Sequence, residues 1–275
     1  MVVLTGANSG IGLHATRNLL ARGWRVAALD VDTDAVGDLG DLGHDGDLAV
    51  LRCDVRSDAD VASAVRAVLD RWGRIDVLVN NAAVAPFARF EEMPPEDMRA
   101  VFDVNLFGYA RTIAAVLPAM KAQGHGTIVN VASMLALMGL PTLPAYAASK
   151  GAVDGLTRSL ALDLRRHGIR VILFHPPSTR TPAAAPLCLP KVFTGDPVKV
   201  GAALARAVRS RRRLVTADRR TAVLLVVGRL APGTFGRLLS RLVAMSQAAS
   251  ARRRRSAPTS SSVLAGDIGE RERPR

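Results

Sequence analysis

The chain has 275 residues, of which 49% are hydrophobic, so it is long enough to bury a large core within one α/β domain. Its net charge of +13 is unevenly placed, because positions 1–195 hold 19 basic and 19 acidic side chains and positions 196–275 hold 18 and 5. A neutral body with only 4% aromatic residues argues against a nucleic-acid-binding domain.

Two further features of the sequence bear on where in the cell the protein is found. The chain has no run of about 18 consecutive apolar residues, and it opens directly into a short apolar strand, so we expect neither a membrane span nor a signal peptide. Its two cysteines, Cys53 and Cys188, are far apart and lie in apolar contexts. This pattern indicates reduced thiols and a cytoplasmic protein.

Short apolar runs alternate with helical patterns along most of the chain. The runs that indicate buried strands are residues 2–4, 24–29, 49–52, 75–79, 127–131, 171–174 and 214–216. Between them, Ser57 begins a capping box, Pro94 and Pro95 can open a helix, and Gly73 and Gly168 can end helices. The alternation predicts a Rossmann-like α/β fold, a doubly wound parallel sheet in a single domain, with ligands at the carboxyl ends of the strands.

A glycine-rich turn separates the first strand from the first helical pattern. Gly6, Gly10 and Gly12 allow a tight turn, close approach of a pyrophosphate and close helix packing, although a flexible loop is the alternative. Asp30 ends the second strand, which follows that helical pattern. Its carboxylate can accept hydrogen bonds from a ribose and repel a 2′-phosphate, which favours NAD while leaving NADP possible. The alternative is that Asp30 only begins a polar loop.

Tyr146 and Lys150 are four positions apart in a helical segment, so both side chains can face one pocket. Ser133 follows the fifth predicted strand, and Asn105 lies in the helical segment before that strand. A free tyrosine titrates near 10, but a nearby ammonium favours the phenolate. Tyr146 could therefore transfer a proton in a reaction that transfers a hydride to or from a nicotinamide, with Ser133 bonding the reacting oxygen.

In type, order and spacing, these residues resemble the classical short-chain dehydrogenase/reductase family. The Thr-Gly-x-x-x-Gly-x-Gly turn, residues 53–55, the Asn-Asn-Ala-Ala run at 80–83 and the stretch 175–181 each resemble a motif of that family. The resemblance implies a catalytic tetrad of Asn105, Ser133, Tyr146 and Lys150, with Asn105 seating a water that relays protons to Lys150.

The same resemblance implies a cofactor site. Its expected members are Gly6, Asn8, Ser9, Gly10, Ile11, Gly12, Asp30, Asp54, Val55, Asn81, Ala82, Ala83, Tyr146, Lys150, Pro176, Thr179 and Thr181. Two positions depart from the family pattern, since Ala83 and Pro177 stand where the family has glycine. Proline fixes φ and removes a donor, which puts the path of the loop over the cofactor in question.

The C-terminal third carries the remaining expectations. A lid at about residues 182–197 is apolar and proline-rich, which favours a small hydrophobic alcohol or ketone. Residues 234–246 form an amphipathic helix that packs on the body or a second subunit, or alternatively makes peripheral contact with an anionic membrane. The domain then covers residues 1–245, and residues 247–275 form a basic, disordered tail.

The function that these patterns predict is an NAD(P)-dependent oxidoreductase acting on a secondary alcohol or ketone, and the resemblance implies a homo-oligomer. The alternative is a regulatory protein that binds the cofactor on the same scaffold without catalysis. The five histidines show no metal-ligand spacing, so we predict no metal site.

Overall fold

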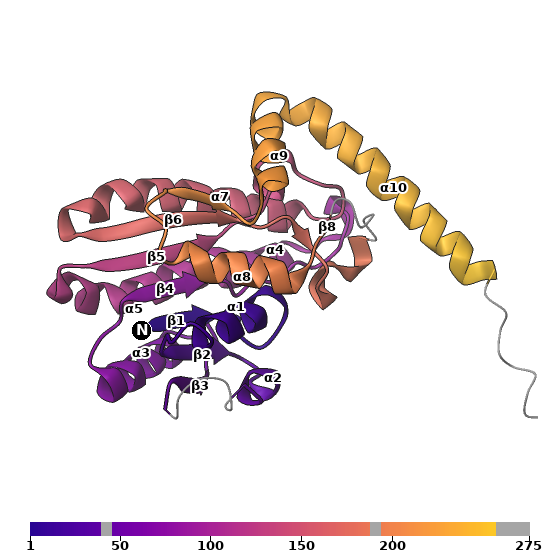
Figure 1. Ribbon diagram of the computed structural model, residues 1–275. Coiled ribbons are helices and arrows are strands. Elements are labelled where there is room, and N and C mark those ends of the chain that lie inside the picture. The colour runs from indigo at the N-terminus through magenta and orange to yellow at the C-terminus, as the bar shows by residue number, and fades with distance from the viewer. Residues whose placement is uncertain (40–45, 188–193, 257–275) are drawn as a thin grey trace, which may run out of the picture.

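A seven-stranded parallel sheet organises the computed structural model, which describes residues 1–39, 46–187 and 194–256 (Figure 1). The strands lie in the order β3-β2-β1-β4-β5-β6-β9. Their bounds are β1 (Val2–Thr5), β2 (Val26–Asp30), β3 (Leu48–Arg52), β4 (Val77–Asn80), β5 (Gly126–Val131), β6 (Ile169–His175) and β9 (Leu214–Thr216). Each predicted strand is present close to its expected ends, so the predicted fold class is confirmed.

The strand order reverses at β1, which pairs with β2 on one side and β4 on the other. Val2 is in register with Val26 and with Val77, and both pairings are parallel. The chain therefore winds outward from β1 to β3, returns to β4 and winds outward again to β9. Such a switch point leaves a crevice beyond the carboxyl ends of the strands, where open α/β sheets bind ligands.

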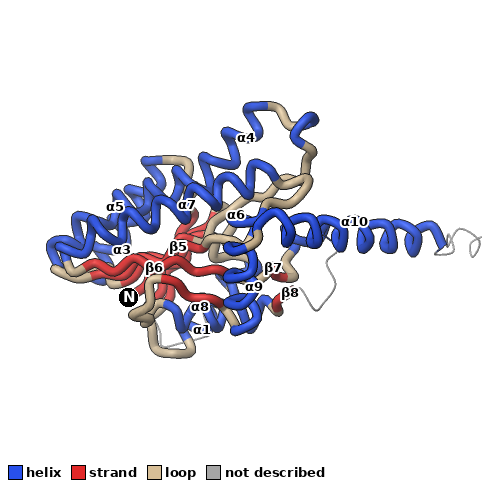
Figure 2. The backbone as a smooth tube through the Cα atoms, turned by 90° about the horizontal axis from the view of Figure 1, so that it is seen from above, coloured by secondary structure: helices blue, strands red, loops and turns tan. Residues whose placement is uncertain are grey.

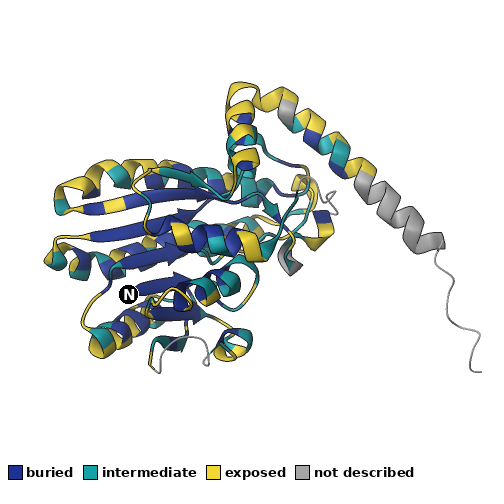
Figure 3. Ribbon diagram, in the orientation of Figure 1, coloured by how far each residue is buried: buried dark blue, intermediate teal, exposed yellow. Residues whose placement is uncertain are grey.

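Helices cover both faces of the sheet. On one face, α1 (Gly10–Leu20) and α8 (Pro197–Ala207) pack on each other and on buried side chains of β1, β2 and β6. On the other face lie α3 (Asp58–Trp72), α5 (Gly108–Gln123) and α7 (Pro144–Asp163). Figure 3 shows the strands almost entirely buried between these layers. Two-sided burial explains why the strand sequences are continuous apolar runs.

The helix ends follow the local signals in the sequence. The Ser57 side chain accepts a hydrogen bond from the Asp60 N–H and caps α3, and Gly73 ends that helix with φ of 69°. Pro95 occupies the first position of α4 (Pro95–Phe102), where its missing N–H costs nothing.

Several short elements connect these layers. They are α2 (Asp34–Gly37), η1 (Phe90–Glu92), the π-helical turn η2 (Asp103–Phe107), α6 (Leu135–Met138), η3 (Leu164–His167), β7 (Ser178–Thr179), η4 (Pro182–Leu187) and β8 (Thr194–Gly195). β7 and β8 form a separate two-stranded sheet. The predicted lid therefore begins as η4, while residues 188–193 of it lie outside the described part of the chain.

Two helices follow the sheet, α9 (Arg219–Leu230) and α10 (Pro232–Ser256). Figure 2 shows α10 running out beyond the helices that cover the sheet. The helix predicted for residues 234–246 continues in the structure to Ser256, into the predicted tail, while the domain boundary at residue 245 stays a prediction. Alanine and arginine, which dominate that stretch, are among the best helix formers, so a helix propagates there without an apolar stripe. Residues 257–275 of the predicted tail lie outside the described residues.

One continuous helical run, Pro95–Gln123, is long and apolar enough to cross a membrane by length and composition, since an 18-residue window within it has a mean hydropathy of 1.3. Within it, α5 packs against α3, β4 and β5, as expected of a helix covering a sheet. The pair α9 and α10 also passes the same test jointly, but it is bent by 111°. The criterion of consecutive apolar residues had missed both segments.

Candidate active site

A cavity of about 750 Å³ lies at the carboxyl ends of the strands, where the switch point places it. Loops after β1, β2, β4, β5 and β6 contribute its walls. The cofactor-site residues that line it are Gly6, Ser9, Gly10, Ile11, Asp30, Asp54, Val55, Asn81, Ala82, Ala83, Tyr146, Lys150, Pro176, Thr179 and Thr181. The structure thus brings fifteen of the seventeen expected positions to one cavity, together with Ser133.

The glycine-rich turn leaves no room for side chains. A Cβ on Gly12 would lie 1.9 Å from the Gly6 carbonyl oxygen. Gly6 itself has φ of +67°, and its Cβ would lie 2.7 Å from the Ala82 backbone. The turn delivers the chain to the N-terminus of α1, where Ser9 makes no side-chain cap hydrogen bond. First-turn N–H groups are therefore available to a phosphate, so the residues present fit a dinucleotide.

Asn8 and Gly12 do not line the cavity but shape the turn that does. The Asn8 backbone N–H donates to Asp30 Oδ2 at 2.8 Å, and Asn8 Oδ1 accepts from the Val36 N–H at 2.8 Å. Asn8 therefore ties the glycine-rich turn to the end of β2. These bonds give Asn8 a positioning role, and its contact with the cofactor, which the resemblance implied, stays a prediction.

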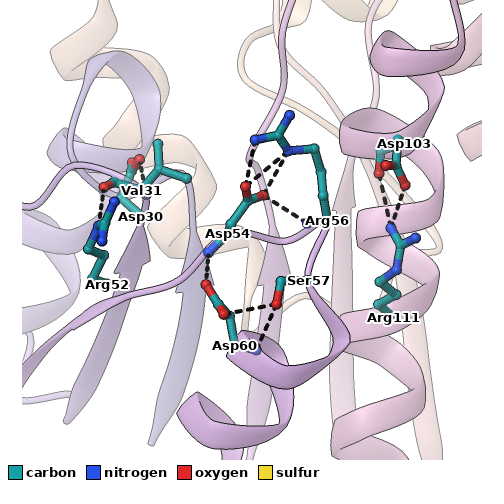
Figure 4. A network of polar contacts seen from close by, with 9 residues as sticks. All are labelled: Asp30, Val31, Arg52, Asp54, Arg56, Ser57, Asp60, Asp103 and Arg111. Carbon is teal, nitrogen blue, oxygen red and sulfur yellow. Dashed lines mark hydrogen bonds and ion pairs between the residues drawn. The ribbon is translucent and has the colours of Figure 1, made fainter.

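Acidic and basic side chains meet at the Asp30 end of the cavity (Figure 4). Arg56 contacts both carboxylate oxygens of Asp54, the shortest distance being 2.6 Å, and its hydrogen bond holds the pKa of Asp54 below its usual value. Arg52 Nε donates to the Val31 carbonyl at 3.2 Å. Asp30 Oδ1 accepts from the Val31 N–H at 2.8 Å. Both arginines therefore already have partners within the chain.

Tyr146 and Lys150 stand one turn apart on α7. Lys150 is 1% exposed, and its Nζ donates to the Val131 carbonyl at 2.8 Å and to Tyr109 Oη at 3.0 Å. The same Nζ lies 5.9 Å from the centre of the Tyr146 ring. Burial lowers the pKa of Lys150 to about 7. Burial raises the pKa of Tyr146, and a hydrogen bond with Ser133 opposes that rise.

Asn105 lies in the π-helical turn η2 and is fully buried. Its Oδ1 accepts from the Val84 N–H at 2.8 Å, and its Nδ2 donates to the Val84 carbonyl at 2.9 Å and to Ser149 Oγ at 3.0 Å. These bonds join α7 to the chain that leaves β4. Asn105 thus contacts the neighbour of Lys150 in sequence, and the water relay that the resemblance implied stays a prediction.

The loop after β6 keeps its place beside the cavity despite Pro177. Pro177 precedes β7, and Ser178 of that strand is in register with Thr194 of β8. Thr179 Oγ1 donates to the Pro177 carbonyl at 2.8 Å. Thr181 packs so closely on the glycine-rich turn that a Cβ on Gly10 would lie 2.8 Å from its methyl group. The loop therefore packs against the glycine-rich turn, where the phosphates of a dinucleotide are expected.

Sequence reasoning missed several residues in or beside the site, and three of them matter most for the argument. Tyr109, which holds Lys150, is one of only two tyrosines and follows Asn105 at a spacing of four, which could have indicated a shared helix face. Leu224 of α9 and Leu239 of α10 line the cavity from the far end of the chain. No local pattern signals that second contribution, because it depends on how the C-terminal helices pack.

Two further titratable groups have pKa values that are shifted by burial. His175 is buried, which lowers its pKa to about 4, and burial raises the pKa of the free Cys53 thiol to about 11. Among residues 1–39, 46–187 and 194–256, no three His, Cys, Asp or Glu side chains are grouped to hold a metal ion. Cys188 lies outside the described residues.

A doubly wound sheet, a glycine-rich turn before α1 and a Tyr-Lys pair facing one cavity define the class of dinucleotide-binding α/β oxidoreductases. A family model described as short chain dehydrogenase matches residues 1–189. The chain belongs to this family, which binds a nicotinamide cofactor.

Known relatives include dehydrogenases of different small molecules. The chain is 38% identical over 188 residues to 2-(R)-hydroxypropyl-CoM dehydrogenase of Xanthobacter autotrophicus, covering 66% of this chain and 75% of the relative. It is 35% identical over 196 residues to trans-4-hydroxycyclohexanecarboxylate dehydrogenase of Sinomonas cyclohexanicum, covering 68% and 75%. The solved 3-ketoacyl-(acyl-carrier-protein) reductase of Brucella melitensis, complexed with NADH, is 28% identical with a TM-score of 0.71, covering 78% and 93%.

Proposed function

We propose that this oxidoreductase interconverts a secondary alcohol and a ketone, with Tyr146 as the acid/base and NAD as the cofactor. The observation that carries the proposal is the convergence of Ser133, Tyr146 and Lys150 with the glycine-rich turn on one cavity of about 750 Å³. Hydride acceptor, proton acceptor and substrate need to meet within a few ångströms, and this is the place where the chain can hold all three.

The proton chemistry belongs to Tyr146. When bound, the nicotinamide supplies the hydride chemistry, taking hydride from the alcohol carbon or returning it to the ketone. As hydride leaves the carbon, the Tyr146 phenolate takes the hydroxyl proton, and in reduction the phenol returns it. The Ser133 hydroxyl bonds the same oxygen and stabilises the charge that develops there.

The role of Lys150 is to favour the ionised form of the Tyr146 phenol. An ammonium a few ångströms from a phenol favours the ionised form of the phenol. At an effective dielectric constant near 20, the electrostatic interaction energy of the ammonium and the phenolate is roughly 3–4 kcal/mol. Lys150 is held in place by the Val131 carbonyl and Tyr109 Oη. Burial lowers the pKa of Lys150 to about 7, so a neighbouring phenolate would in turn favour the ammonium, and the two groups would become charged together.

The electrostatics of the adenosine end support NAD over NADP. Asp30 lines the cavity, and its carboxylate would accept hydrogen bonds from the ribose hydroxyls of NAD and repel the 2′-phosphate of NADP. The two nearest cations, Arg52 and Arg56, are engaged by the Val31 carbonyl and Asp54. Binding NADP would require one of those contacts to break.

The substrate end of the cavity supports a hydrophobic substrate. Its walls include Leu140, Leu143, Leu187, Leu224 and Leu239. Apolar walls favour a substrate with a substantial hydrocarbon body, because its transfer from water contributes about 25 cal/mol per Å² of apolar area.

A screen of secondary alcohols graded by chain length and ring content, monitored by NAD reduction, tests the reaction. The Tyr146→Phe variant keeps the ring and loses the hydroxyl, so we expect it to bind NAD with unchanged affinity and to retain no more than about 1% of kcat. Near-wild-type turnover by Tyr146→Phe would refute the acid/base assignment. NAD binding without turnover of any alcohol or ketone would favour the regulatory alternative.

The cofactor assignment has its own test, which compares kcat/KM for NAD and NADP. We expect the wild type to prefer NAD and Asp30→Ala to narrow the preference by about tenfold or more, because one charge repulsion is removed. The matched control is Asp32→Ala, which removes a carboxylate two positions away in the exposed turn. A wild type that prefers NADP would contradict the assignment.

A further inference from the structure

The outer side of α9 is apolar although it faces solvent. Thr221, Leu225 and Gly228 are the buried residues of this helix. The exposed apolar side chains, at the spacing i, i+3, i+4 and i+7, are Val223, Val226, Val227 and Leu230. Leu230 is 82% exposed. Single exposed apolar residues need no explanation, but four that form one stripe on a helix indicate a contact surface.

The next helix also carries exposed apolar side chains. Leu239 and Val243 of α10 are buried against the body, while Leu238 and Met245 are 55% and 69% exposed. Figure 3 shows exposed residues running along the outer sides of both helices. We call the exposed apolar side chains of α9 and α10, with the arginines beside them, the outer face.

The charge of this segment has one sign. Between Asp218 and Asp267 the sequence contains nine arginines and no acidic residue. Arg219 and Arg220 precede the α9 stripe, and Arg237 and Arg241 flank Leu238 on α10; all four are exposed. A surface that combines an apolar stripe with flanking arginines complements a bilayer whose headgroups are anionic and whose interior is apolar.

We propose that the outer face of α9 and α10 docks this protein on an anionic lipid bilayer. A second copy of the chain is the poorer occupant, because a symmetric contact would bring the same arginines together without an acidic partner from this segment. Nucleic acid would satisfy the arginines but leave Val226 and Leu230 without an apolar partner.

Docking would also place the substrate cavity at the lipid surface. Leu224 of α9 and Leu239 of α10 line that cavity, and they belong to the same two helices that carry the outer face. A helix lying in the headgroup region buries its apolar side by roughly 5–10 Å. The wall of the active site would therefore border the bilayer.

Sedimentation of the full-length protein with vesicles of phosphatidylcholine, with and without phosphatidylglycerol, tests the proposal. We expect binding only to the anionic vesicles, weakening as salt is raised. Arg237→Gln with Arg241→Gln removes two of the four flanking arginines, and its expected loss is about 30-fold in partitioning, which is about 2 kcal/mol. The matched control is Arg22→Gln with Arg66→Gln, two exposed arginines on the body, and we expect it to bind like the wild type.

A second variant distinguishes docking through the outer face from electrostatic attraction between the vesicles and the arginines beyond residue 251. Val226→Gln with Leu230→Gln keeps every charge, so attraction of the tail is unchanged, and we expect at least about tenfold weaker binding. Binding unaffected by this pair would overturn the proposal, because it would show adsorption by charge alone. Equal loss in the Arg22/Arg66 control, or no sedimentation with either vesicle, would also overturn it. A change in molecular mass of the Val226/Leu230 variant without lipid would assign the face to a second copy instead.

Discussion

A buried ammonium without a carboxylate partner weakens the folded state, and Lys150 permits a quantitative test. We predict that Lys150→Met raises the free energy of unfolding of the cofactor-free protein, and that the gain is larger at pH 6 than at pH 9. Methionine fills a similar volume and carries no charge, so it removes the cost of burying the ammonium. The loss of the bond to the Val131 carbonyl is the same at both pH values.

The magnitude follows from the lowered pKa. Lys150 has a pKa of about 7 in the folded protein against 10.5 as the reference, so between these values the folded state binds fewer protons than the unfolded state. Stability from this group therefore rises with pH through that window. At 1.36 kcal/mol per unit, Lys150 costs about 5 kcal/mol at pH 6 and about 2 kcal/mol at pH 9. The gain in unfolding free energy of Lys150→Met over the wild type should thus be about 3 kcal/mol smaller at pH 9 than at pH 6.

Denaturation with urea at the two pH values, for wild type and variant, measures this difference. Other groups that titrate between pH 6 and 9 act equally in both proteins and cancel in the comparison. Lys150→Arg is the control, because it keeps a charge that stays on throughout the range, and we expect it to lack the gain. An advantage of Lys150→Met that is equal at both pH values would refute the burial argument.

Two further predictions concern the neighbours of this lysine and the glycine-rich turn. Tyr109→Phe removes an acceptor of the Lys150 ammonium, so the pKa of Lys150 falls further and kcat should drop more at pH 8 than at pH 6; identical pH profiles would contradict this. Gly12→Ala forces a Cβ against the Gly6 carbonyl, so we expect about 2–3 kcal/mol of destabilisation and weaker NAD binding by calorimetry. Gly155→Ala, a helical glycine with open space, should gain up to about 1 kcal/mol, and the opposite order of the two variants would refute the packing argument.

The sheet was predictable because its strands are buried on both faces and so appear as uninterrupted apolar runs. Helix ends with a stereochemical marker, such as Ser57 and Gly73, were predictable for the same local reason. The π-helical turn at 103–107 was not, because its five residues have no distinctive propensity and the turn depends on packing around Asn105.

The candidate site divides in a similar way. The residues that face the dinucleotide lie in short motifs next to strand ends, so spacing alone brought them to one edge of the sheet. The role of Tyr109 was not predicted, because it depends on a contact with Lys150, which lies far along the sequence. The continuation of α10 through residues 247–256 was not predicted, because that stretch has almost no large apolar residues and was expected to be disordered, whereas helix propensity alone favours a helix there.

Leu224 and Leu239 place part of the cavity wall outside the segment that matches the family model. Both leucines lie beyond residue 189, where the match to the family model ends, whereas Gly6, Tyr146 and Lys150 lie within it. The reacting half of the cavity therefore lies within the part of the chain that matches the family model, and part of the half that would receive the substrate lies outside that match. Relatives can share a reaction with this protein and still differ from it in the molecules they accept.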